Sequence, residues 1–85
     1  MELGRTFFNI GLLYRTLNVY IDKHGVYVVV EDETIGVPNK QFSSRRFNLT
    51  KNYNTIESNI QRGMRYFKAP QESIGHMVQR YKARQ

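Results

Sequence analysis

The residues best suited to chemistry in this chain are cations interleaved with aromatic rings. Arg45 and Arg46 lie between Phe42 and Phe47. Guanidinium groups bind phosphates through paired hydrogen bonds, and aromatic rings stack on exposed bases. The mixture therefore predicts contact with DNA or RNA. In a strand Arg45 and Phe47 would share one face and Phe42 and Arg46 the other. The alternative interpretation is that both phenylalanines anchor a sheet and the arginines are merely exposed.

A second row of cations follows a helical repeat in the last third of the chain. Arg62, Arg65 and Lys68 recur every third residue and would form a basic ridge beside an apolar stripe. Arg80, Lys82 and Arg84 are interpreted instead as cations favoured by the dipole at a helix C-terminus. The predicted residues that bind nucleic acid or another partner are Lys40, Arg45, Arg46, Lys51, Arg62, Arg65 and Lys68.

The inventory for catalysis is thin. His24 lies in a predicted turn and His76 at a helix margin, and neither has an evident serine or acid to pair with. Glu31 and Glu33 could converge on a hard cation at a strand end, but Glu31, Asp32 and Glu33 are better explained as a solvated strand end. The chain has no cysteine and no glycine-rich phosphate loop. We expect no catalytic residues, no metal site and no cofactor, and hence no enzyme.

The basic charge is concentrated in one part of the chain. Residues 1–36 hold three basic and five acidic residues, a net charge of −2, whereas residues 37–85 hold ten basic and two acidic residues, a net charge of +8. Such asymmetry predicts a face that meets an anionic surface, which is nucleic acid, an acidic protein or nucleoprotein, or anionic lipid. The alternative is a surface charge that serves only solubility.

Length and composition indicate one small folded domain spanning residues 1–85. The 85 residues are 40% hydrophobic and 13% aromatic, which is enough for a packed core. No apolar run approaches the roughly 18 residues of a membrane span, and the start carries a glutamate where a signal peptide is positive. We expect a cytoplasmic protein with no membrane contact.

The first part of the chain reads as strands. Residues 6–14 and 17–22 alternate apolar and other residues, with Gly11 interpreted as a bulge or a place of close backbone approach. Residues 26–31 form a β-branched and aromatic run. The segment 22–25 predicts a hairpin turn. A two-residue loop would pair Ile21 with Val28 and Val19 with Val30, and a longer loop would shift the register by one residue; the sequence leaves both open.

The strand at residues 26–31 offers apolar groups to both faces of a sheet. Either the N-terminal segment covers the second face or a homodimer buries it.

The second part predicts a further strand and two helices. Residues 41–47 suit a third or fourth antiparallel strand. Asn52 or Asn54 can cap a helix whose apolar stripe runs to Phe67, and a second helix begins near Pro70. The stripes are Tyr53, Ile56, Ile60, Met64 and Phe67, then Ile74, Met77, Val78 and Tyr81. The fold class is α+β, with an antiparallel sheet of three to four strands followed by two C-terminal helices packed on one face.

The run VYIDKHGVYVVVEDETIG, followed by RRF and an amphipathic helix, resembles the arm-type DNA-binding domain of phage integrases over residues 19–67. The likeness rests on the order of elements and on Tyr20, Gly25 and Tyr27. It implies a sheet that enters the major groove, although this hairpin is acidic and the chain adds an N-terminal strand and a C-terminal helix. Nearly the whole length is also similar to small anti-CRISPR proteins of phages, which block a host nucleoprotein complex.

Together these features predict a non-enzymatic, basic module of phage or mobile-element type that contacts DNA or RNA phosphates. The alternative is a phage-encoded, anti-CRISPR-like inhibitor that binds a host protein. In either case we expect it to act in the cytoplasm of the host cell.

Overall fold

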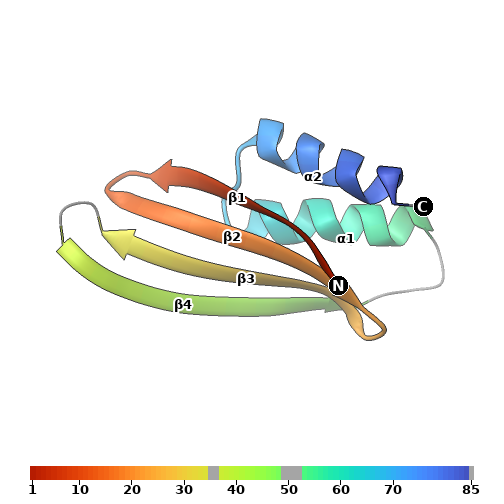
Figure 1. The fold of residues 1–85 in the computed structure, drawn as a ribbon, viewed down its shortest axis with the longest axis horizontal. Coiled ribbons are helices and arrows are strands. Elements are labelled where there is room, and N and C mark those ends of the chain that lie inside the picture. The colour runs from red at the N-terminus through yellow and green to blue at the C-terminus, as the bar shows by residue number, and fades with distance from the viewer. Residues whose placement is uncertain (35–36, 49–52, 85) are drawn as a thin grey trace.

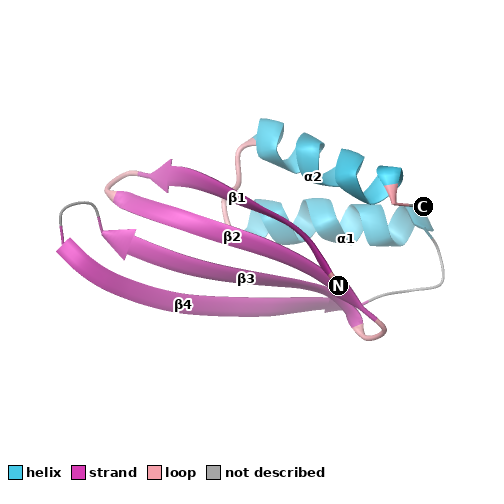
Figure 2. Ribbon diagram, viewed as in Figure 1, coloured by secondary structure: helices cyan, strands magenta, loops and turns pink. Residues whose placement is uncertain are grey.

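The computed structural model describes the backbone of residues 1–34, 37–48 and 53–84, and the side chains of residues 1–34 and 55–84. It is a four-stranded antiparallel sheet in the order β1-β2-β3-β4 with two helices on one face (Figures 1 and 2). The predicted α+β class is confirmed. The elements are β1 (Glu2–Ile10), β2 (Leu13–Asp22), β3 (Gly25–Thr34), β4 (Val37–Asn48), α1 (Tyr53–Tyr66) and α2 (Gln71–Ala83).

The first hairpin differs from the sequence interpretation. Residues 6–14 are not one strand, because the chain turns at Gly11 and Leu12 and pairs Ile10 with Leu13. Gly11 has a φ of 56°, a left-handed conformation that glycine adopts without a steric penalty. The apolar alternation continues through the turn, because it includes Leu12, which is 76% exposed. The two-residue period alone therefore could not reveal the turn. Gly11 is therefore a turn residue and not a bulge.

The second hairpin has a two-residue loop, Lys23 and His24, between the paired residues Asp22 and Gly25. The Asp22 carboxylate accepts hydrogen bonds from the backbone N–H groups of His24, at 2.8 Å, and Gly25, at 3.1 Å. A short side chain that bonds the backbone two residues ahead favours such a turn. The hairpin is confirmed, but the expected pairs were wrong by two residues.

The observed register pairs Ile21 with Val26 and Val19 with Val28. A shift of two residues keeps every side chain on its own face, so the apolar set still faces the core.

The core lies between the sheet and the helices. Alternate residues of β2 and β3 face the helices, and the apolar ones at the centre of the sheet, from Leu17 and Val19 to Val26, Val28 and Val30, are at most 1% exposed. α1 packs against β3 and β4, and α2 against β1. The predicted stripe of α2 is buried, and that of α1 is buried or partly buried wherever its side chains are described. Fully buried residues include Leu17, Val19, Val26, Val28, Val30, Ile60, Met64 and Ile74.

The N-terminal segment does not cover the second face of the sheet. It forms β1 within the same sheet, and both helices lie on the opposite side from that face (Figure 1). This alternative is therefore wrong, and the homodimer stays a prediction.

The helical hairpin turns through Lys68, which has a φ of 68°. The Ala69 N–H donates to the Met64 carbonyl at 2.9 Å, spanning five residues, which is the hydrogen bond of a Schellman C-cap. α1 thus ends before Pro70, which is the N-cap of α2. The predicted caps at Asn52 and Asn54 fall outside the described side chains. Among the described residues, no helix is long and apolar enough to cross a membrane.

A nearly buried ion pair ties the sheet to this turn. The Arg15 Nε and Nη2 atoms donate to the two Asp32 carboxylate oxygens at 2.6 and 2.7 Å, and Nη1 donates to the Phe67 carbonyl at 2.7 Å. The hydrogen bonds to Asp32 raise the pKa of Arg15, against the opposite effect of burial. Asp32 is only 6% exposed, so its interpretation as part of a solvated strand end was wrong.

Candidate nucleic-acid interface

The strand register places the predicted cations of β4 on both faces of the sheet. The register of β4 pairs Lys40 with Glu33, Arg45 with Val28 and Arg46 with Tyr27. Positions 45 and 46 therefore belong to opposite faces, as alternation predicted, and their side chains are outside the described part. Lys51 lies outside the described residues altogether.

The predicted cations of α1 lie in the helix layer, behind the sheet. Arg62, Arg65 and Lys68 are all exposed. Arg62 donates from Nη2 to the Asn59 carboxamide oxygen at 2.7 Å. Tyr66 stands among them, 54% exposed, with its ring 5.0 Å from that of Phe67 in an edge-on arrangement. We call Arg62, Arg65, Tyr66 and Lys68 the α1 patch.

Aromatic side chains gather on the face of the sheet that carries no helix, here called the open face. Phe7 of β1 and Tyr14 of β2 lie with ring centroids 6.1 Å apart and planes 13° apart, and they are 51% and 41% exposed. Tyr20 and Tyr27 form a second pair, with centroids 6.2 Å apart. Rings exposed to this degree are available to a ligand, because neither helix covers them.

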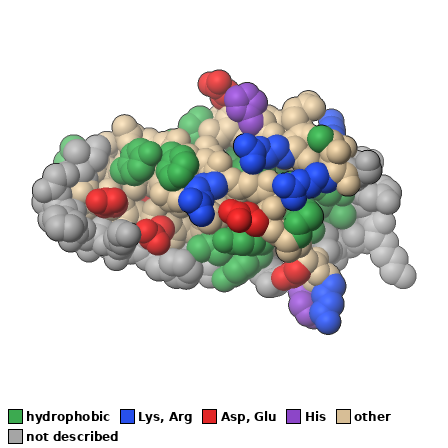
Figure 3. Space-filling model, viewed as in Figure 1, with side chains coloured by type: hydrophobic (Ala, Val, Ile, Leu, Met, Phe, Trp, Pro, Cys, Tyr) green, Lys and Arg blue, Asp and Glu red, His purple; other side chains and the backbone are tan. Residues whose placement is uncertain are grey.

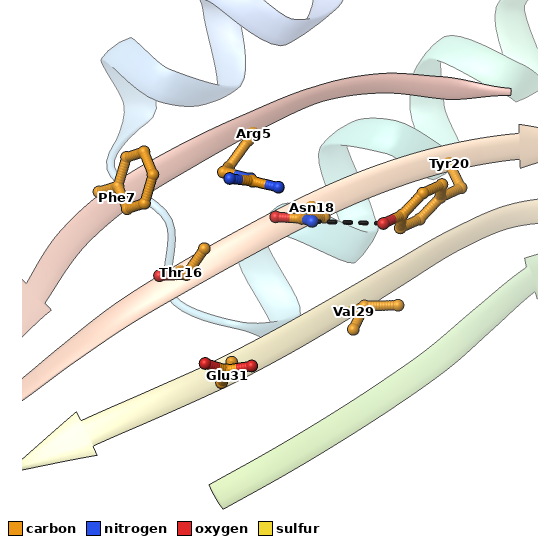
Figure 4. A pocket seen from close by; sticks show the side chains of 7 residues that line it. All are labelled: Arg5, Phe7, Thr16, Asn18, Tyr20, Val29 and Glu31. Carbon is orange, nitrogen blue, oxygen red and sulfur yellow. Dashed lines mark hydrogen bonds between the residues drawn. The ribbon is translucent and has the colours of Figure 1, made fainter. Parts of the chain in front are cut away.

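Between the two aromatic pairs the open face is hollowed by a groove of about 380 Å³. Its lining comes from two rows of cross-strand partners, in which Phe7 pairs with Thr16 and Arg5 pairs with Asn18, and from Tyr20 of the next row. Figure 4 shows these side chains projecting from the three strands on the side away from the helices. The lining residues are Arg5, Phe7, Thr16, Asn18, Tyr20, Val29 and Glu31.

Asn18 lies at the centre of this groove, and its side-chain oxygen has no hydrogen-bond partner within the described part of the chain. Its Nδ2 atom donates to the Tyr20 hydroxyl at 3.3 Å (Figure 4). Its Oδ1 atom is covered from solvent and accepts no hydrogen bond within the described part of the chain. A buried acceptor without a hydrogen bond lowers the stability of the fold. A ligand that donates a hydrogen bond to the Asn18 oxygen would remove this cost.

A second, shallower groove of about 390 Å³ lies where β1 passes the end of α2. Three arginines line it, Arg5, Arg80 and Arg84, together with Glu2, Leu3 and Gly4. Figure 3 shows basic side chains gathered over β1 and α2 on this side of the molecule. Arg5 lines both grooves, so this basic groove continues into the open face.

No local pattern in the sequence could have identified this interface. Phe7 meets Tyr14 because the chain reverses at Gly11, and the sequence interpretation continued the strand through that point. Arg80 lies in the last turn of α2 and Arg84 directly follows it, where the helix dipole favours cations. Their position beside β1 could not be inferred from the dipole. With a turn assigned at Gly11, Phe7 and Tyr14 become diagonal neighbours on one face of two adjacent strands.

The described residues contain no group of three or more histidine, cysteine, aspartate or glutamate side chains that could hold a metal ion. His24 and His76 are both exposed. Compared with known proteins, the chain matches no family model, no curated protein and no solved structure.

Proposed function

We propose that this protein is a small basic module that binds DNA or RNA, with bases held against the open face of the sheet. The observation that carries the proposal is the pair of exposed, nearly parallel rings of Phe7 and Tyr14 on a sheet face that no helix covers. Stacking of a base on an aromatic side chain contributes about 1–3 kcal/mol and tolerates any base sequence.

The charge of the chain supports the same ligand. The net charge is +6, and Arg5 stands on the open face between the two aromatic pairs. Arg46, which the sequence analysis expected to contact phosphates, is the register partner of Tyr27 on the last strand. A polyanion whose bases are free to stack satisfies both the rings and the cations, and a single strand has such bases whereas a duplex does not.

The proposal is tested by fluorescence anisotropy with labelled single-stranded DNA, single-stranded RNA and duplex DNA of one length. We expect single strands to bind more tightly than the duplex. The double variant Phe7→Ala/Tyr14→Ala should weaken single-strand binding by roughly 5- to 150-fold, the equivalent of stacking one base. Leu12→Ala is the control, because it removes exposed apolar surface from the same hairpin without removing a ring.

Two results would contradict the proposal. One is the absence of binding below about 100 µM protein in low salt, where phosphate contacts are strongest. The other is an equal loss of binding in Leu12→Ala and in Phe7→Ala/Tyr14→Ala, which would indicate nonspecific hydrophobic binding. Far-ultraviolet circular dichroism of each variant establishes that it is folded.

A second candidate function is that of a protein-binding inhibitor of the anti-CRISPR kind, acting through the α1 patch. An exposed tyrosine among three cations is a suitable anchor for an acidic protein surface. Tyr66 is the residue that favours this candidate. Affinity purification from a host lysate, with and without nuclease, tests it: a partner retained after nuclease treatment and lost in Tyr66→Ala supports a protein target, whereas a partner recovered only with intact nucleic acid counts against one.

A further inference from the structure

The basic groove joins residues that are far apart in the sequence. Arg5 is the fourth residue of β1, whereas Arg80 lies in the last turn of α2 and Arg84 directly follows that helix. Three arginines and one acidic residue, Glu2, line the same groove. Arginine keeps its charge in proteins, so the residues that line the groove carry a net positive charge. The cations repel one another in the absence of a ligand, and the groove attracts an anion.

The positions of these arginines are set by the backbone of β1. An added Cβ at Gly4 would lie 3.0 Å from the Nη1 atom and 3.2 Å from the Cδ atom of Arg80, so the missing side chain makes room for Arg80 against the strand. Arg84 donates from Nη1 to the Glu2 carbonyl at 3.1 Å. The register of β1 is irregular between Glu2 and Gly4, at the same place.

The helix dipole does not account for the whole cluster. It favours Arg80 and Arg84 at the C-terminal end of α2, but it gives no reason for Arg5 on the neighbouring strand. Among the described residues, the side chains of Arg5 and Arg80 form no hydrogen bond or ion pair. The carboxylates of Asp32 and Glu57 pair with other cations, Arg15 and Lys82. Arg5 and Arg80 thus keep their donors for a ligand.

We infer that Arg5, Arg80 and Arg84 form a binding site for one backbone phosphate of single-stranded nucleic acid. The inference rests on the proposed function, because Arg5 also lines the groove between the aromatic pairs. A strand whose bases lie on the open face leaves it past Arg5 and brings its phosphate into the basic groove. The guanidinium fork suits a phosphate, which accepts paired hydrogen bonds.

The test compares Arg80→Gln/Arg84→Gln with Lys82→Gln on labelled single-stranded DNA over a range of salt concentrations. Lys82→Gln removes a positive charge from the same helix, but Lys82 pairs with Glu57 at 3.2 Å and does not line the groove. We expect the arginine variant to bind roughly 10-fold or more weakly at low salt. Its slope of log affinity against log salt should fall by about 0.7, the value for one phosphate of a single strand. The slope of Lys82→Gln should not change.

A second arm of the experiment locates the phosphate. Oligonucleotides in which one linkage at a time is a neutral methylphosphonate should bind the wild-type protein more weakly at one position, and should bind Arg80→Gln/Arg84→Gln with no such dependence. Inorganic phosphate at matched ionic strength should compete only weakly. Displacement of the strand by millimolar phosphate would overturn the inference and assign the groove to the free anion.

The outcomes separate the inference from the proposed function. If the wild-type protein binds no oligonucleotide, both are overturned. If it binds and loses affinity in Phe7→Ala/Tyr14→Ala, while Arg80→Gln/Arg84→Gln behaves like Lys82→Gln, the proposed function stands and the phosphate site is wrong.

Discussion

Removing either member of the Arg15 and Asp32 pair should destabilise the fold far more than removing an exposed salt bridge. The two side chains are 15% and 9% exposed, and three hydrogen bonds of 2.6–2.7 Å connect β2, β3 and the end of α1. Breaking a buried pair costs about 3–5 kcal/mol, because the remaining charge stays buried without its partner. A domain of 85 residues has a free energy of unfolding of about 4–13 kcal/mol, so the loss is a large part of the total.

Arg15→Met and Asp32→Leu remove one charge each, and the double variant removes both. We expect each single variant to lose about 3–5 kcal/mol. The double variant should recover most of this loss and remain about 1–2 kcal/mol below the wild type, because the Phe67 carbonyl still lacks its Arg15 donor. The coupling between the two substitutions is therefore expected to be at least about 4 kcal/mol.

Urea denaturation followed by circular dichroism measures these differences. With a slope near 1 kcal/mol per molar urea for a small domain, each single variant should lower the unfolding midpoint by about 3 M, or be unfolded without urea. The pKa of Arg15 is raised, so its contribution is present at every pH below the ordinary arginine value and is lost only in strongly alkaline solution. The effect of Arg15→Met should therefore not depend on arginine titration near neutral pH. Single variants within about 0.5 M of the wild type, or a double variant as unstable as the sum of the singles, would refute the reasoning.

Two backbone predictions concern the turn after α1 and the basic groove. Lys68→Gly should raise the free energy of unfolding by about 0.5–1 kcal/mol, because Lys68 has a φ of 68°. Lys68→Ala keeps a Cβ and should not raise it. Equal effects of the two substitutions would show that the lost charge matters rather than the backbone conformation. Gly4→Ala should lower stability by about 1–3 kcal/mol, because its Cβ would lie 2.8 Å from the Met77 sulfur. Gly75→Ala is the control for the latter, since its Cβ meets nothing within 4 Å in a helix and should stabilise by up to about 1 kcal/mol; thermal unfolding that ranks Gly4→Ala with Gly75→Ala would contradict the close contact.

Short-range patterns in the sequence were sufficient for much of the fold. The stripe of α2 and the described part of that of α1 identified residues that are buried in the structure, and the Asp22–Gly25 turn is stabilised by its own aspartate, as turn chemistry predicts. The assignment of Arg45 and Arg46 to opposite faces follows from the two-residue period of a strand and agrees with the register of β4. Each of these features depends on residues within one turn or one strand.

The candidate interface depends instead on contacts between distant residues. Arg5 and Arg80 come together because α2 lies against β1, and Arg15 meets Asp32 through the register of β2 and β3. Because the turn at Gly11 was not recognised in the sequence, the stacking of Phe7 on Tyr14 was not predicted. The amino-acid sequence by itself determined which segments become strands and helices and which of their faces are apolar, since periodicity and turn propensity act locally. Only the tertiary structure decided which polar and aromatic side chains meet, because strand register and helix docking are set by packing over the whole chain.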